Sequence, residues 1–174
     1  KPNKPKEPNK PNKPNTFNSM MDKHFMTMAI ERAREGIAAG QTPFGACIVR
    51  DRKVLACEHN RVWETTDITA HAEVTALRAA CRNIGDIDLS GAVLYSTCEP
   101  CPMCFSAAHW ARIGRIVFGA DIDDAERAGF NEFKVSNACL KTMGGLSCAV
   151  DSGILRDECV ALFAEWQARG GAAY

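Results

Sequence analysis

A chain of 174 residues, 46% of them hydrophobic, is long enough to form one globular domain with its own core. No apolar stretch approaches the roughly 20 residues of a membrane-spanning helix, and no apolar segment follows the N-terminal lysines, so we expect no secretory signal and a cytoplasmic protein without membrane contact. The net charge is zero, but residues 1–19 hold five lysines against one glutamate, so the remainder is acidic and a strong nucleic-acid binder is disfavoured.

Residues 1–18 differ in composition from the rest of the chain. The stretch Lys1–Asn15 reads KPNKPKEPNKPNKPN, with five of the eight prolines and no apolar residue. Such a segment cannot bury a core, so we expect a disordered arm biased toward polyproline II. A solvated tail is the simpler interpretation, and contact with a phosphate backbone is the alternative. The folded domain is predicted over residues 19–174, with Ser19 and Asp22 resembling the capping box of a first helix.

The predicted elements continue with a helix to Ala39, where Gly40 ends it. The runs Gly45–Val49 and Lys53–Glu58, joined by the turn Asp51–Arg52, predict an antiparallel hairpin. A loop is expected at 60–69. Beyond it, the pattern predicts helices over 71–84, 103–110, 123–128 and 156–167, and strands over 92–96, 115–120 and 148–150. Residues 131–147 fit neither a helical nor a strand pattern. This alternation predicts an α/β fold with helices on both faces of a mixed sheet.

Metal-binding residue types stand at the starts of two predicted helices. His71 opens one, and Cys101 and Cys104 open the next within the run PCPMC. Cysteines three apart on a helix share a face and can bind one metal ion, and a helix N-terminus favours their thiolate form. Two thiolates and one imidazole leave the fourth position of a tetrahedral zinc ion open, which is typical of catalytic sites.

Glu73 lies two residues after His71, where a helical neighbour points in a different direction. A carboxylate there can face water at the metal, accept its proton and pass it to a leaving amine. Cys-x-x-Cys alone would also fit a redox pair or a structural zinc site with Cys98 as fourth ligand. The full pattern, His-x-Glu followed by Pro-Cys-x-x-Cys, is the signature of zinc deaminases.

Longer stretches around these motifs resemble the cytidine-deaminase-like superfamily and, within it, bacterial guanine deaminases. The resemblance runs from about Met21 to the C-terminus. It is carried by PFGACIV ending at Val49, TAHAEVTALRAAC at 69–81, LYSTCEPCPMC at 94–104, and HWAR with the later run ADIDDAERAGF. The resemblance implies a three-layer α/β/α sandwich around a five-stranded mixed sheet, a homodimer, and one zinc ion.

The same resemblance implies roles for individual residues. His71, Cys101 and Cys104 would hold the zinc ion, with Glu73 as the proton shuttle. Asn60 would hydrogen-bond the base.

Further pocket residues are expected from the resemblance and from position. The backbone amide near Ala72 would contact the reacting group, and Phe44 and Trp110 could line the pocket. The final Tyr174 resembles the end of that family, whose terminal segment closes over a neighbouring subunit's active site.

One departure concerns the substrate. Guanine deaminases of this kind tend to have an acid directly after Gly129-Phe130, where this chain has Asn131 and then Glu132. If the substrate is guanine, Glu132 is expected to bind the purine or move its protons. The run GILRDEC at 153–159 resembles tRNA adenosine deaminases instead. We therefore expect a zinc-dependent deaminase of a nucleobase or nucleoside. The preferred substrate is expected to be guanine, which would give xanthine and ammonia; the alternatives are adenosine in tRNA, and cytosine or cytidine.

Overall fold

The computed structural model describes residues 16–174, with side chains from Ser19 onward, so the predicted disorder of residues 1–15 lies outside the described residues. The elements in chain order are α1 (Thr16–Ala38), β1 (Gly45–Arg50), β2 (Lys53–His59), α2 (Val62–Thr65), α3 (Ala72–Ile84), β3 (Val93–Cys98), α4 (Pro102–Trp110), β4 (Arg115–Ala120), α5 (Ile122–Arg127), α6 (Asn137–Gly144), β5 (Ala149–Asp151) and α7 (Arg156–Gln167). Every helix in this part of the chain falls short of the length or apolar character that a bilayer crossing needs.

The five strands form one mixed sheet in the order β2-β1-β3-β4-β5. β1 pairs with β2 and β3 in antiparallel directions, whereas β3–β4 and β4–β5 are parallel. Both residues of the β1–β2 turn, Asp51 and Arg52, have positive φ, as tight hairpin turns require. Because β3 and β4 are parallel, their carboxyl ends reach the same edge of the sheet, and β3 leads there into the segment that carries Cys101.

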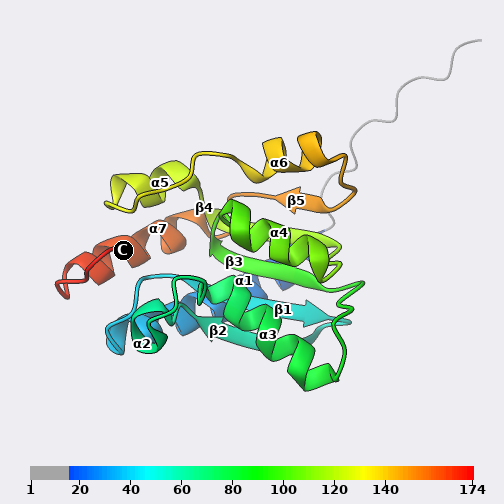
Figure 1. The fold of residues 1–174 in the computed structure, drawn as a ribbon, viewed down its shortest axis with the longest axis horizontal. Coiled ribbons are helices and arrows are strands. Elements are labelled where there is room, and N and C mark those ends of the chain that lie inside the picture. Colours follow the sequence, from blue (N-terminus) through cyan, green and yellow to red (C-terminus); the bar gives the residue numbers. More distant parts are fainter. Residues whose placement is uncertain (1–15) are drawn as a thin grey trace, which may run out of the picture.

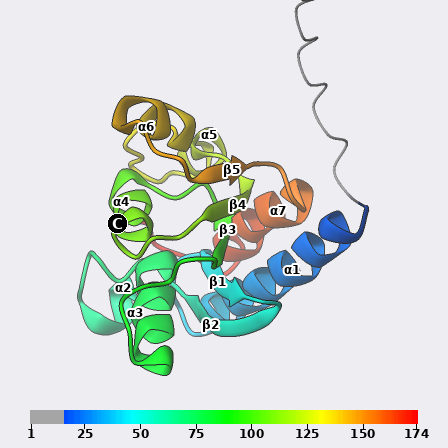
Figure 2. The ribbon, with the colours of Figure 1, turned by 90° about the vertical axis from the view of Figure 1, so that its right-hand side faces the viewer.

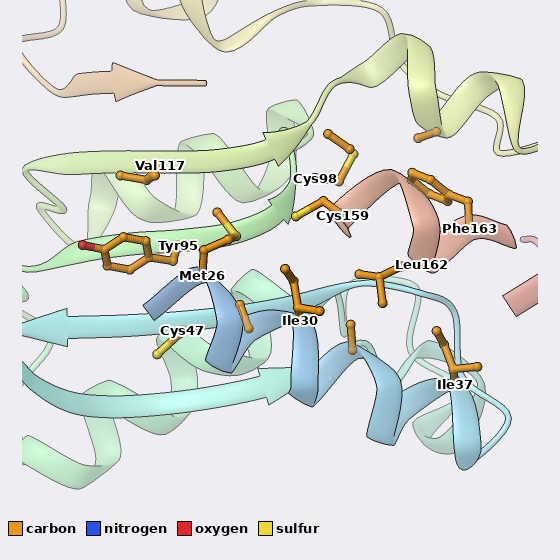
Figure 3. Close-up of a cluster of buried hydrophobic side chains, with 14 of the residues drawn as sticks. Met26, Ile30, Ile37, Cys47, Tyr95, Cys98, Val117, Cys159, Leu162 and Phe163 are labelled. Atoms are coloured by element: carbon orange, nitrogen blue, oxygen red, sulfur yellow. The ribbon is translucent and has the colours of Figure 1, made fainter. Parts of the chain in front are cut away.

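Helices cover both faces of this sheet, as expected for an α/β/α sandwich (Figures 1 and 2). α1 and α7 lie on one face, and α3 and α4 on the other. Each face has its own apolar core. The core under α1 and α7 is drawn in Figure 3 and includes Met26, Ile30, Ile37, Tyr95, Val117, Leu162 and Phe163; the opposite core includes Ala72, Leu94, Phe105 and Ile116.

Two contacts fix α1 on the sheet. Gly45 allows the helix to lie directly on β1, because a Cβ there would meet the Ala29 carbonyl oxygen at 2.1 Å. Asp22 is buried, and its carboxylate accepts hydrogen bonds from the Tyr95 hydroxyl and from two guanidinium nitrogens of Arg115, all at 2.8 Å. This ion pair ties α1 to β3 and β4.

The start of α1 corrects one expectation. The helix begins at Thr16, so Ser19 lies within it and forms no capping box, and the Asp22 carboxylate is held by the sheet instead. The predicted loop at 60–69 contains the short helix α2. The unassigned stretch 131–147 contains α6, whose first turn is capped by Ser136 Oγ accepting from the Cys139 N–H at 3.2 Å.

Candidate active site

The three predicted metal ligands lie at the N-termini of two helices. His71 immediately precedes the first residue of α3, and Cys101 that of α4; neither side chain caps its own helix, so both remain free to bind elsewhere. Pro102 fits the first helical position because it has no N–H to satisfy there. Cys104 follows in the first turn of α4 and is fully buried.

The spacing of the donor atoms fits a tetrahedral zinc ion. His71 Nδ1 lies 3.6 Å from Cys101 Sγ and 3.5 Å from Cys104 Sγ. Zinc bonds of ordinary length at tetrahedral angles would separate a nitrogen and a sulfur ligand by about 3.6 Å. Among the described residues this is the group of three donors found within 4.8 Å of one another. The geometry therefore fits zinc without rearrangement.

The two cysteines differ in acidity because they share a hydrogen bond. This bond lowers the pKa of Cys101 to about 4, against the opposing effect of burial and with a further contribution from His71. The same bond, together with burial, raises the pKa of Cys104 well above its usual value. Because a metal ion binds the thiolate form of cysteine, the lowered pKa of Cys101 favours metal binding.

Glu73 faces the same pocket from the first turn of α3. Its side chain is buried, and burial raises the pKa of its carboxyl; the charge of His71 lowers the pKa in part, and Cys101 adds a smaller increase. A raised pKa makes a carboxylate a better proton acceptor, which suits a group that takes up a proton and releases it again.

A pocket of about 380 Å³ opens over these residues. Its walls are Phe44, Asn60, Ile68, His71, Glu73, Cys98, Glu99, Cys101, Pro102, Met103, Phe130, Asn131, Glu132, Phe133 and Tyr174. The structure therefore brings the sequence-predicted residues Phe44, Asn60, Glu132 and Tyr174 to the metal-binding group.

Asn60 is fully buried and held on two sides. Its Oδ1 accepts a hydrogen bond from the Val62 N–H at 3.0 Å, and its Nδ2 donates to the Tyr174 hydroxyl at 2.8 Å. An asparagine amide can donate two hydrogen bonds and accept two. One N–H and one acceptor position therefore remain for a ligand with a complementary edge.

Tyr174 lies in the pocket of its own chain, whereas the resemblance implied closure over a neighbouring subunit. Its ring is 5.7 Å from that of His71 and 6.2 Å from that of Phe130, centroid to centroid. The Trp63 indole N–H donates to the Ala172 carbonyl at 3.1 Å and fixes the C-terminal segment. The last residue thus forms part of the wall beside the metal ligands.

Glu132 places a second carboxylate in the pocket. Its pKa is raised, chiefly by burial and then by the negative charge of Cys101, with His71 acting in the opposite direction and Glu73 adding a smaller increase. The acid expected directly after Phe130 is thus found one residue later in the sequence, and its side chain still lines the site.

Trp110 and Ala72, which were also predicted to contact the substrate, are not among the residues that line the pocket. Trp110 is 79% exposed and does not line the pocket, which corrects that expectation. It is the last residue of α4, and the helical rise places it about 12 Å from the end that carries the ligands. Ala72 is the fully buried first residue of α3; the contact expected of its backbone amide stays a prediction.

Sequence reasoning missed several pocket residues. Glu99 and Met103 flank Cys101 within the same motif, so their position beside the ligands could have been inferred from it. Ile68 and Phe133 lie outside regular elements and are exposed, so neither periodicity nor burial could have indicated them.

Comparison with known proteins agrees with this geometry. Residues 19–120 match the family model described as the cytidine and deoxycytidylate deaminase zinc-binding region. The chain is 45% identical to a guanine deaminase of Bacillus subtilis, over 65% of this chain and 73% of that protein. It is 35% identical to a tRNA-specific adenosine deaminase of the same organism, over 79% of this chain and 83% of that protein.

The fold is also found in a solved structure. A guanine deaminase from Nitrosomonas europaea superposes with a TM-score of 0.77 at 32% identity and covers 84% of both chains. The expected fold is thereby confirmed. The matched region is a zinc-binding one, and it contains His71, Cys101 and Cys104, whose donor geometry fits that metal.

Proposed function

Because this chain belongs to the cytidine and deoxycytidylate deaminase zinc-binding family, we propose that it hydrolyses the exocyclic amine of a free purine base, with guanine and water giving xanthine and ammonia. The family supports a hydrolytic nucleobase or nucleoside deaminase. The observation that carries the choice of a purine is the second carboxylate: Glu132 lines the same pocket as Glu73.

The size of the pocket favours a free base. A volume of about 380 Å³ is at the small end of ligand sites, which generally measure about 300–1,000 Å³. Tyr174 forms one wall and is held by Asn60, so the C-terminal segment limits the space above the metal ligands. A base attached to a polynucleotide would need this segment to move.

The side chains divide the proposed reaction between them. Asn60 offers its free N–H and acceptor to the polar edge of the base, and Phe44 provides an apolar wall. Bound zinc supplies Lewis-acid activation of water. Glu73 accepts a proton from the attacking water and returns it to the departing amine. Glu132 holds or moves a proton on the purine ring. Asn131 cannot do this, because the side-chain amide of asparagine neither gains nor loses a proton at physiological pH.

The second candidate is a tRNA adenosine deaminase. It is favoured by the longer alignment with the tRNA-specific relative, which extends over 79% of this chain. Steady-state rates at several salt concentrations distinguish the two. An enzyme that contacts many phosphates loses affinity steeply with salt, and one that binds a neutral base hardly responds.

The test is a substrate panel followed by one substitution. Purified protein is given guanine, guanosine, adenine, cytosine, cytidine and a tRNA anticodon hairpin, and ammonia release is recorded. Glu132→Gln should then lower the rate on guanine, while Glu158→Gln, an exposed acid on α7, should leave it unchanged. Absence of guanine turnover by the wild type removes the substrate proposal, and an unchanged rate in Glu132→Gln removes the role of Glu132.

A homodimer also forms part of the proposal. Met103 and Trp110 are exposed on α4 and lie two turns apart on one face of the helix. Because Met103 also lines the pocket, a second copy seated on this face would adjoin the active site. Light scattering of the wild type and of Trp110→Glu tests this: the variant should become monomeric, and a monomeric wild type contradicts the proposal.

A further inference from the structure

Asn137, the first residue of α6, makes two hydrogen bonds to the segment that precedes the metal ligands. Its backbone N–H donates to Glu99 Oε1 at 2.7 Å, and its side-chain Nδ2 donates to the Pro100 carbonyl at 2.6 Å. Glu99 and Pro100 are the two residues immediately before Cys101. Asn137 therefore contacts the ligand segment from an element 36 residues later in the chain.

The ligand segment has few donors of its own. Pro100 and Pro102 on either side of Cys101 have no backbone N–H. The Glu99 N–H donates to the Ala120 carbonyl at 2.8 Å and so fixes the sheet side of the segment. The bonds from Asn137 fix it from the other side.

Stability alone explains this asparagine poorly. Asn137 is fully buried, and its Oδ1 has no hydrogen-bond partner among the described residues. A buried acceptor without a partner is destabilising, whereas an apolar side chain of similar size is not. An apolar side chain at this position could not donate a hydrogen bond to the Pro100 carbonyl, as Asn137 Nδ2 does.

We propose that Asn137 is a positioning residue for the zinc site, which holds the Glu99–Pro100 peptide so that Cys101 stays at ligand distance from His71. The 3.6 Å between Cys101 Sγ and His71 Nδ1 depends on where this peptide lies. Partners that orient metal ligands typically change metal affinity by about 10–100-fold when removed. The inference concerns the metal site and does not depend on which base is deaminated.

The experiment measures zinc release from the purified zinc-loaded protein into an excess of a colorimetric chelator. Asn137→Leu keeps the approximate size but removes the side-chain donor. Zinc release should become about 10–100-fold faster. Ser136→Ala is the matched control, because it removes the capping bond of α6 to Cys139 but leaves both bonds to the ligand segment. Its release rate should stay within about twofold of wild type.

Two results would overturn the proposal. The first is release of zinc from Asn137→Leu at the same rate as from the wild type. The second is equal acceleration in Asn137→Leu and Ser136→Ala, which would show that Asn137 only anchors α6. If Asn137→Leu does not fold, Glu99→Gln tests the other hydrogen bond between Asn137 and the ligand segment, because a neutral oxygen accepts the Asn137 backbone N–H less strongly than a carboxylate does. Release at the wild-type rate from that variant would equally reject the role.

Discussion

Removing the hydroxyl of Tyr174 should weaken substrate binding and leave the chemical step nearly unchanged. Tyr174→Phe keeps the ring beside His71 and Phe130 but deletes the acceptor at 2.8 Å from Asn60 Nδ2. Asn60 would then be held by the Val62 N–H alone. A neutral hydrogen bond contributes about 0.5–1.5 kcal/mol net, so the KM for the base should rise about 2–13-fold.

Steady-state kinetics on the base that the panel identifies measures this effect. Tyr95→Phe is the control: it also loses a buried hydroxyl hydrogen bond, to Asp22, but on the far side of the sheet from α3 and α4. That variant should lose thermal stability and keep the wild-type KM. A KM for Tyr174→Phe that is unchanged or lower refutes the reasoning, because the hydroxyl would then compete with the base for Asn60 and not orient the amide.

Four further outcomes follow from the site and the fold. Glu73→Gln should keep its zinc, as judged by metal analysis, and lose about 10²–10⁴-fold in kcat; a loss below tenfold contradicts its role in proton transfer. Cys104→Ala should lose zinc and show a lower melting temperature, since zinc binding contributes to folding; full metal content would remove it from the ligand set. Deletion of residues 1–18 should leave the rate on a small base unchanged, and a lowered rate on a polynucleotide alone would favour the tRNA candidate. Burial opposes the ionisation of Asp22, but hydrogen bonds from Arg115 and the Tyr95 hydroxyl outweigh burial and hold the pKa of this carboxyl below its ordinary value. The ionised carboxylate therefore stabilises the fold, and this stabilisation is lost as the pH falls through the lowered pKa. In urea unfolding, Asp22→Asn should have a lower free energy of unfolding than wild type at pH 7, and the difference should shrink below about pH 4.

The two cysteine ligands could be predicted because their geometry is local, whereas His71 is assigned from the combined His-x-Glu and Pro-Cys-x-x-Cys signature. Cys101 and Cys104 share one helical turn, and a helix N-terminus fixes the direction of each side chain. The contact between Asn60 and Tyr174 joins residues 114 apart, and no spacing rule connects them. Such a contact depends on how α7 and the C-terminal segment return to the sheet.

Position within an element explains the remaining differences. Trp110 belongs to the same helix as the ligands, but the length of α4 carries it away from the pocket. α6 has only eight residues, of which Asn137 alone is buried, so it shows no apolar periodicity. The buried polar residue that contacts Glu99 and Pro100 therefore gave no signal in the sequence pattern.

The pocket combines a rigid part with an irregular one. His71, Glu73 and Cys101 are fixed by two helices on the sheet, whereas Asn131–Val135 connect α5 to α6 without regular structure. Residues in such a connection can change with little cost to the core. On the proposed role of Glu132, replacement of residues 131–135 would change which base the pocket accepts while the helices that carry His71, Glu73 and Cys101 stay as they are, so this connection is the natural place to redesign the pocket.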